Sequence, residues 1–181
     1  MRRNRLLAFT IAPLLLLAGC GGGSGTSSFQ FDQFTSFEFN EFPPFSTDFT
    51  LGTPPKSVRF TGGRTLTVGV PNLYRTGIAA WEISGVSTVA TADFDTPATA
   101  FALYAANQGS GQGIIRVYDE SDVLIATIPV VTDNMMDASA LIVRTAGELG
   151  VAGIGKVTVT NTSIPGNLNK TWIDDFSASQ P

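Results

Sequence analysis

From Ser57 to the end of the chain, hydrophobic and polar positions follow a period of two. Alternating stretches cover 65–70, 99–106 and 156–160, and mostly hydrophobic runs cover 114–118, 123–131 and 140–143. These stretches are bounded by glycine, asparagine, aspartate or proline, which is typical of antiparallel strands. We therefore predict an all-β domain, an antiparallel two-sheet β-sandwich of the jelly-roll type with about eight strands. The one helix predicted is a short one over 135–140.

The first nineteen residues are organised like a signal peptide. Three arginines precede an uncharged stretch of thirteen residues, 6–18, which is too short to span a bilayer core of about 30 Å. This stretch runs into the sequence LAGC at 17–20, which resembles a bacterial lipobox. The resemblance implies cleavage before Cys20 and lipidation of Cys20, so that the lipid holds the protein in the membrane of the cell envelope. Gly21 follows, and in the known sorting rule a residue other than aspartate there favours the outer membrane.

Residues 20–56 are expected to link this anchor to a β-sandwich domain at 57–181. Residues 21–28 form a flexible linker rich in glycine and serine, and 29–49 hold eight of the thirteen phenylalanines with no basic residue. These phenylalanines recur every two to four positions, which fits neither a regular strand nor a regular helix. Either part of the segment pairs as an N-terminal strand and the rest wraps the domain, or the segment docks on an envelope protein or another copy.

The composition excludes several classes of function. The chain has no histidine and one cysteine, which removes histidine-based triads and metal sites, internal disulfides and iron–sulfur clusters. Cleavage before Cys20 would remove three of the eleven basic residues and none of the fifteen acidic ones, giving a net charge of −7. A negative chain without a basic cluster argues against nucleic-acid binding.

No pair of residues in the sequence has the spacing of a convincing nucleophile and base, so we expect no enzymatic activity. Asp93 and Asp95 share one face of a predicted strand, but adjacent carboxylates at the end of a strand are usually solvated. A cleft that gathered Asp93, Asp95 or Lys156 would favour an enzyme instead.

Four stretches resemble a known group of domains. They are 90–104 (ATADFDTPATAFALY), 113–127 (GIIRVYDESDVLIAT), 154–161 (IGKVTVTN) and 172–177 (WIDDFS). Together they are similar to the jelly-roll domains of bacterial secreted proteins of the PEP-CTERM type and to galactose-binding-like carbohydrate modules. The resemblance covers about 58–178 and implies a β-sandwich, a fold that supports many functions.

The same resemblance implies a calcium site. In related carbohydrate modules the first aspartate of such an IDD run commonly helps to bind a structural calcium ion, which indicates Asp174 here. Calcium requires several oxygen ligands, and Glu38, Glu41 or Asp48 could supply the others. The alternative is that Asp174 is a hydrogen-bonded or solvated carboxylate.

The placement of Asp174 on its strand bears on this choice. In a regular strand Trp172, Asp174 and Phe176 would share one face, and an unpaired carboxylate on a core face is costly to bury. A β-bulge that turns the carboxylate away would remove that cost.

A second candidate site consists of aromatic side chains that could stack on a sugar. Trp81, with Glu82 and Tyr74, could form part of such a platform. Trp81 is surrounded by Ile78, Ala79 and Ile83, so it could equally belong to the core.

Two further stretches have the composition of turns. We interpret the glycine-rich 109–113 as a flexible hairpin, because a strand follows it where a phosphate loop needs a helix. We interpret 119–122 (DESD) as a hairpin turn, since aspartate and serine bond to the backbone of turns.

Two functions remain. The first is a lipid-anchored, non-catalytic module that binds carbohydrate or polysaccharide. The second is a structural or protein-interaction lipoprotein that engages an envelope partner through its Phe-rich segment.

Overall fold

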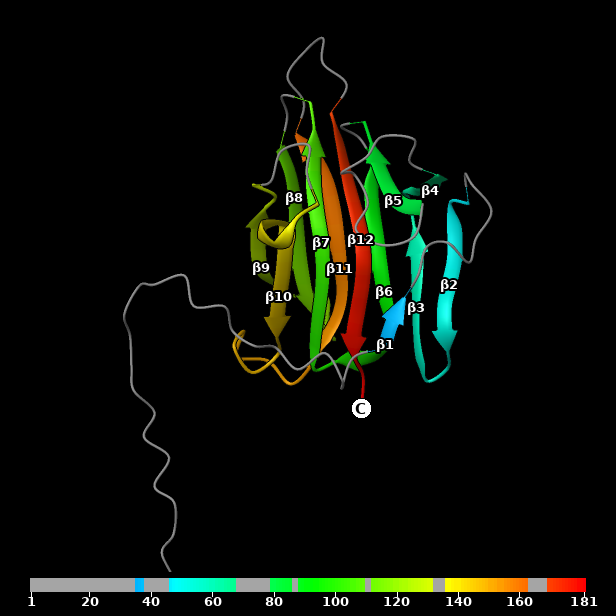
Figure 1. Ribbon diagram of the computed structural model, residues 1–181. Helices are drawn as coiled ribbons and strands as arrows, with labels where there is room; N and C mark the ends of the chain where they lie inside the picture. Colours follow the sequence, from blue (N-terminus) through cyan, green and yellow to red (C-terminus); the bar gives the residue numbers. More distant parts are fainter. Residues whose placement is uncertain are drawn as a thin grey trace, which may run out of the picture. The chain divides into compact units, whose positions relative to one another are not determined.

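The computed structural model describes residues 35–37, 46–67, 79–85, 88–109, 112–131, 136–162 and 169–181. The strands of the sheet drawn in front in Figure 1, here the front sheet, are β1 (Thr35–Phe37), β4 (Arg64–Thr67), β5 (Ala79–Ser84), β7 (Ala100–Gln108), β10 (Leu141–Thr145) and β12 (Lys170–Ser179). Those of the back sheet are β2 (Asp48–Thr53), β3 (Lys56–Thr61), β6 (Val89–Ala98), β8 (Gln112–Asp119), β9 (Leu124–Pro129) and β11 (Ile154–Thr162).

The two sheets have six strands each in the described part of the chain. The front sheet has the order β10–β7–β12–β5–β4, with β1 beside β12, and the back sheet has the order β2–β3–β6–β11–β8–β9. Every pairing between these strands is antiparallel. The predicted two-sheet antiparallel β-sandwich is confirmed, with more strands than the eight expected.

Most connections pass from one sheet to the other, as in sandwiches whose strands turn a corner. The corner between β6 and β7 is a single residue, Thr99. Its amide donates to the Ser179 carbonyl at 2.7 Å, and its carbonyl accepts from the Ala146 amide at 2.8 Å. These two bonds hold the corner against the ends of β12 and β10.

The glycine-rich stretch 109–113 also changes sheets, because it joins β7 in front to β8 at the back. The prediction of a hairpin there was therefore wrong. Gly113 is needed for a steric reason: a Cβ at this position would overlap the Thr171 hydroxyl. The 119–122 turn is a hairpin turn as predicted, with the Asp119 carboxylate accepting from the amides of Ser121 and Val123 at 2.9 and 2.8 Å.

Hydrophobic and polar residues alternate along the strands, so that the hydrophobic side chains of both sheets lie in the space between the two sheets. Phe60 on β3 lies at the centre of the aromatic part of this core and contacts three rings, those of Phe49, Trp81 and Phe176, at centroid distances of 5.3, 5.1 and 5.2 Å. Edge-to-face pairs such as the last two add stability beyond their buried area.

Part of the Phe-rich segment belongs to the sandwich. Strand β1 pairs with the second half of β12, and β2 forms a hairpin with β3. The interpretation that part of this segment pairs as a strand is thus confirmed for β1 and β2, and the sandwich includes residues before Ser57.

Some predictions fall outside the described residues, namely those for Cys20, Glu38, Glu41 and Tyr74. Within the described ranges, no helix is both long and apolar enough to cross a membrane. Of the helix predicted over 135–140, the structure shows a 3₁₀ turn at Ala138–Ala140, which Asp137 caps by accepting from the Ser139 amide at 2.8 Å.

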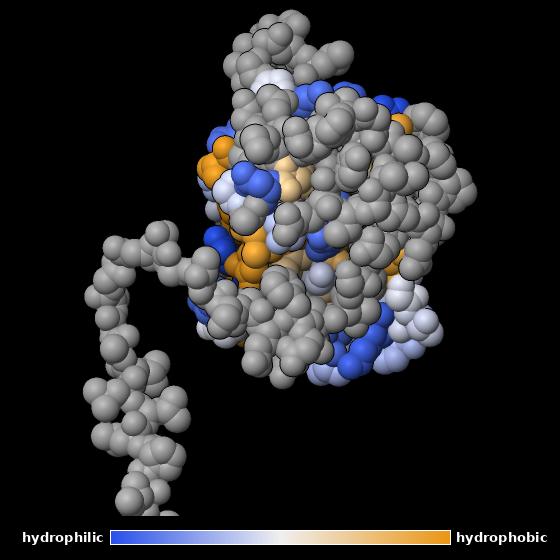
Figure 2. All heavy atoms as spheres, in the orientation of Figure 1, coloured by the Kyte–Doolittle hydropathy of each residue, from blue (hydrophilic) through white to orange (hydrophobic). Residues whose placement is uncertain are grey.

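Figure 2 colours the described residues visible in the orientation of Figure 1 by hydropathy. Hydrophobic patches on the viewed face lie on the side of β9 and β10. Among the described residues, the large hydrophobic side chains with substantial exposure are Val89, Val123, Leu124 and Val131. Val89 begins β6, Leu124 begins β9, and Val123 and Val131 lie just outside the ends of β9; scattered exposure of this kind is normal for a protein surface.

Candidate binding site

A β-bulge in β12 determines on which face of the sheet the aromatic and acidic side chains of the WIDDF stretch lie. The pairing of β12 with β7 shifts by one residue between Asp174 and Ser177, and Asp175 has a positive φ of 46°. Asp174 is 1% exposed and accepts from the Asp175 amide at 2.9 Å. Phe176 joins Ile173 in the core, whereas Trp172 belongs to a second hydrophobic cluster. Because of the bulge, Phe176 faces the core between the sheets and Asp174 does not lie on the same face.

The strand register places charged and aromatic side chains in one row on the outer face of the front sheet. Arg64 on β4 lies opposite Glu82 on β5, and Glu82 lies opposite Trp172 on β12. One position along, Ser84 lies opposite Lys170. Directly opposed side chains in antiparallel strands are close enough to interact.

Three of these side chains form an ionic cluster, here called the Glu82 cluster. The Arg64 Nε and Nη2 atoms both donate to Glu82 Oε1, at 2.8 and 2.6 Å, and Lys170 Nζ donates to Oε2 at 2.8 Å. The Glu82 side chain is 0% exposed, while Arg64 and Lys170 are 39% and 28% exposed. A fully buried carboxylate needs such partners, because its burial alone is strongly unfavourable.

The indole of Trp172 packs beside this cluster. Lys170 Nζ lies 5.5 Å from the Trp172 ring centroid, a cation–π geometry, and Trp172 Nε1 donates to Gln108 Oε1 at 3.2 Å. Met136, just before the 3₁₀ turn, belongs to the same small cluster. Trp172 is 3% exposed, so its ring is a packing element of the outer face.

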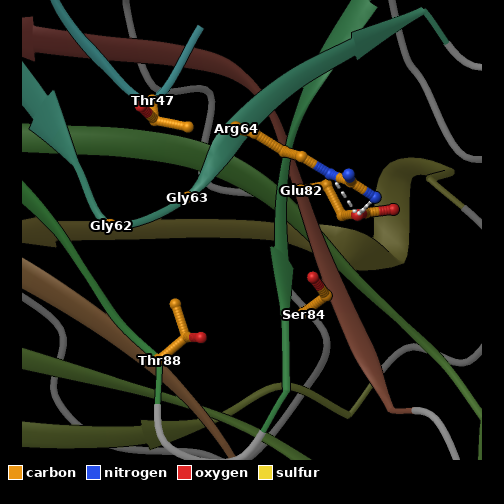
Figure 3. A pocket seen from close by; sticks show the side chains of 7 residues that line it. All are labelled: Thr47, Gly62, Gly63, Arg64, Glu82, Ser84 and Thr88. Carbon is orange, nitrogen blue, oxygen red and sulfur yellow. Dashed lines mark hydrogen bonds and ion pairs between the residues drawn. The ribbon is translucent and has the colours of Figure 1, made fainter. Parts of the chain in front are cut away.

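A pocket of about 150 Å³ opens next to the Glu82 cluster. Its described lining residues come from the segment before β2, the β3–β4 turn, β4, β5 and the residue before β6 (Figure 3); they are Thr47, Gly62, Gly63, Arg64, Glu82, Ser84 and Thr88. All of these residues are polar or glycine. The hydroxyls and the guanidinium supply hydrogen-bonding groups, and the threonine methyls, glycine Cα atoms and arginine stem supply carbon surface.

The two glycines explain why the chain forms a hollow there. Gly62 and Gly63 carry the chain from β3 in the back sheet to β4 in the front sheet. Gly62 has a positive φ of 78°, and a Cβ there would overlap the Val89 carbonyl. A Cβ on Gly63 would overlap the Trp81 indole. The turn therefore runs tightly against the core, and without side chains it leaves the space in front of it open.

The back sheet carries its charges on exposed strands. Arg59, Asp93, Lys156 and Tyr118 are consecutive cross-strand partners on β3, β6, β11 and β8. Lys156 pairs with Asp122 at 2.7 Å, where the two side chains are 26% and 74% exposed. Asp93 and Lys156 are thus neighbours in a partly exposed row of charges.

The pKa values of this row follow from its contacts. Hydrogen bonds from Arg59 lower the pKa of Asp48. Burial raises the pKa of Asp93, and the positive charge of Lys156 only partly opposes the increase. The hydrogen bond to Asp122 raises the pKa of Lys156.

The structure separates the residues of the predicted sugar platform. Trp81 and Glu82 are neighbours on β5 and point to opposite sides: Trp81 lies in the core and is 1% exposed, whereas Glu82 lies on the outer face. Of the two positions considered for Trp81, the core is the observed one, and its ring has no free face for a sugar.

Of the other predicted acidic ligands, Asp48 is the one that the structure describes. Asp48 pairs with Arg59 at 2.7 Å on the back sheet, at about half exposure. The described residues contain no group of three or more acidic, histidine or cysteine side chains that could hold a metal ion. A calcium role for Asp174 stays a prediction.

Sequence reasoning missed Arg64 and Lys170. They lie 18 and 88 positions from Glu82 along the chain, so no local motif links the three. One signal was present, since Glu82 interrupts the otherwise apolar run AAWEI. A carboxylate in such a strand indicates either an outward-facing position or a buried partner.

Comparisons with known proteins give structural likenesses only. No protein-family model and no curated protein matches the sequence. Three solved structures are similar in fold. A variant of a carbohydrate binding module of family 29 has a TM-score of 0.41 at 14% identity, covering 80% of this chain and 89% of its own. A DUF4465 family protein from Bacteroides caccae has a TM-score of 0.45 at 10% identity, covering 87% and 97%.

The third is the enzymatically active domain of tailspike protein 4 from bacteriophage CBA120. Its TM-score is 0.32 at 12% identity, and the match covers 84% of this chain and 20% of the tailspike chain. The β-sandwich described above follows from the strand pairing itself.

Proposed function

We propose that this protein is a non-catalytic carbohydrate-binding module, with the pocket beside the Glu82 cluster as its binding site. The observation that carries the proposal is the lining of that pocket, in which every described residue is polar or glycine. Sugars present hydroxyl groups at the ring edge and carbon–hydrogen surface on the ring faces. A pocket that combines hydroxyls, a guanidinium and small carbon surfaces complements both.

The size of the pocket sets the size of the ligand. A cavity of about 150 Å³ is known to hold benzene, and this pocket has about that volume. A hexose has about twice as many non-hydrogen atoms as benzene, so the pocket suits part of one sugar residue, such as a terminal or protruding residue of a polysaccharide. The aromatic rings of Trp81 and Trp172 are buried, so neither of these two tryptophans offers a stacking platform.

The lipobox completes the proposed role. Lipidation of Cys20 would fix the module to the cell envelope, with the outer membrane as the expected location, and the glycine- and serine-rich stretch 21–28 would tether it. The module would then hold envelope or extracellular polysaccharide close to the membrane.

A glycan array tests the proposal with the full chain purified in detergent. The wild type is expected to bind at least one glycan. Thr88→Phe should abolish that binding, because the new ring fills the pocket. Thr127→Phe is the matched control: it places the same ring on an exposed position of β9 and should bind as the wild type does.

Binding that persists in Thr88→Phe would place the site elsewhere, and an array without any signal would contradict the function. Running the array with calcium and with a chelator also tests Asp174. Binding lost in chelator, and lost equally in Asp174→Asn, would support the calcium prediction; unchanged binding would contradict it.

A further inference from the structure

We propose that Asn161, a buried residue outside the pocket, is a positioning residue that keeps two walls of the binding pocket at a fixed separation. This inference rests on the proposed function and concerns the same site. It follows from one hydrogen bond that crosses from the back sheet to the front sheet next to the pocket, and from the buried network that supports this bond.

The pocket has walls from both sheets. Glu82 and Ser84 belong to β5 of the front sheet, whereas Thr88 immediately precedes β6 of the back sheet. Figure 3 shows Ser84 and Thr88 on these two different segments. The width of the pocket therefore depends on how far apart the two sheets lie at this end of the sandwich.

The front wall extends past the end of a neighbouring strand. β4 begins at Arg64, which lies opposite Glu82, so that Ile83 and Ser84 of β5 continue beyond it. β12 pairs with these two residues on one side only. Backbone pairing with β4 therefore ends one residue before the part of β5 that carries Ser84.

Asn161 supports this part of β5 from the other sheet. It lies on β11 of the back sheet, and its side-chain amide donates to the Ile83 carbonyl at 2.8 Å. Ile83 is the residue between Glu82 and Ser84, which both line the pocket. The hydrogen bond thus holds the front wall at its centre.

The same residue is also tied to the back wall. Its chain neighbour Thr160 pairs with Val89 in the antiparallel ladder of β11 and β6. Val89 directly follows Thr88, the lining residue on that side. Asn161 therefore connects the two walls, by its backbone to one and by its side chain to the other.

A buried network orients the Asn161 amide. The Thr171 hydroxyl donates to its carbonyl oxygen, and Asn161 and Thr171 are 4% and 0% exposed. Thr171 also contacts Asn107, whose side-chain oxygen accepts from the Gly113 amide at 2.8 Å. Because unpaired buried polar groups are costly, each member of such a network restricts the orientation of the next. Asn161 can thus act on the pocket without lining it.

The chain offers a matched residue at the opposite end of the sandwich. Gln180 is 6% exposed, and its amide also crosses between the sheets, donating to the Ser57 and Thr96 carbonyls at 3.3 and 2.8 Å. It follows β12, whose first residue, Lys170, belongs to the Glu82 cluster. A strand of this length spans about 30 Å, so Gln180 makes the same kind of bond far from the pocket.

Calorimetric titration of the full chain in detergent compares Asn161→Leu with Gln180→Leu. The probes are glucose, galactose, mannose and N-acetylglucosamine, each titrated separately. Asn161→Leu should weaken the binding of every sugar that the wild type binds by about tenfold, because the walls are no longer preorganised. Gln180→Leu should keep the dissociation constant within about twofold, because distant sites act independently. Thermal melts measure the stability that each variant loses.

Thr171 provides a more conservative pair of variants, which also tests the inference should Asn161→Leu fail to fold. Thr171→Val keeps the shape of the side chain and removes the hydroxyl that orients Asn161, so it should weaken binding in the same direction. Thr171→Ser keeps the hydroxyl and should bind as the wild type does. A difference in affinity between these two variants at similar melting temperatures is not expected from a role in stability alone.

Hydrogen exchange gives a measurement that needs no sugar. The backbone amides of Ile83, Ser84 and Thr88 should exchange faster in Asn161→Leu than in the wild type, and at the wild-type rate in Gln180→Leu. Unchanged exchange at these three amides in Asn161→Leu would overturn the inference.

The titrations separate the two proposals. Wild-type affinity in Asn161→Leu, or an equal loss of affinity in Asn161→Leu and Gln180→Leu, would overturn the positioning role and leave the carbohydrate function in place. Absence of binding to any sugar by the wild type, here and on the array, would overturn the function itself, and the exchange comparison would then decide the role of Asn161.

Discussion

The outer faces of the two sheets use the same kinds of side chain in different ways. Each has a lysine over an aromatic ring: Lys170 over Trp172 in front, at 5.5 Å, and Lys156 over Tyr118 at the back, at 5.0 Å. Each also has an arginine that donates two hydrogen bonds to a carboxylate. On the front sheet that carboxylate and the indole are buried, whereas on the back sheet the corresponding carboxylate is about half exposed.

This difference in burial has different energetic consequences on the two faces. Exposed ion pairs contribute little to stability because water and salt screen them. A buried carboxylate is costly unless it is held by partners with good geometry. Burial of the Glu82 carboxylate therefore carries a free-energy cost that the exposed pairs of the back sheet do not. The pocket lies beside this carboxylate.

The largest effect is expected where the buried charge loses its partners. Arg64→Ala/Lys170→Ala leaves Glu82, which is 0% exposed, without either cation, and should lower the free energy of unfolding by about 3–5 kcal/mol. Urea unfolding followed by circular dichroism measures this. Arg59→Ala on the back sheet should cause almost no change, and a similar loss in both proteins would refute the contrast between the faces.

The second largest difference is expected between the two lysine–aromatic pairs, in the stability lost when each ring is removed. Trp172→Ala removes a ring that is 3% exposed and should lower the free energy of unfolding by about 3–5 kcal/mol. The small size of the surrounding cluster favours the lower end of this range. Tyr118→Ala removes a ring that is only partly buried and should cost about 1 kcal/mol or less. The same urea experiment compares them, and a cost for Tyr118→Ala equal to that for Trp172→Ala would contradict the assignment of the two faces.

The sequence could predict the sandwich because alternation acts locally, over four to ten residues at a time. It could not decide whether Asp174 and Phe176 share a face, because the bulge that separates their faces follows Asp174 and depends on the pairing of β12 with β7. It also left Trp81 open between surface and core, since its neighbours on β5 fit both. The Glu82 cluster joins β4, β5 and β12, and only the sheet order brings these strands together.

The smallest effects are expected from the exposed charges of the back sheet, where two aspartates should respond to pH with opposite sign. The pKa of Asp48 is lowered from 3.8 by hydrogen bonds from Arg59. Asp48 therefore stabilises the fold above pH 3.8, and this contribution is lost as the pH falls through the lowered pKa. Asp48→Asn should melt slightly below the wild type at pH 7, and the gap should close in acid.

Asp93 gives the opposite prediction because burial raises its pKa above 3.8. Its stabilising contribution is complete below pH 3.8, where the group is protonated in both states, and is lost as the pH rises through the raised pKa. Asp93→Asn should therefore melt slightly above the wild type at pH 7 and converge with it below pH 3.8. Melting curves between pH 3 and pH 7 measure both variants. If Asp93→Asn instead melted below the wild type at pH 7, the attraction of Lys156 and Arg59 would outweigh burial, and the prediction for Asp93 would be wrong.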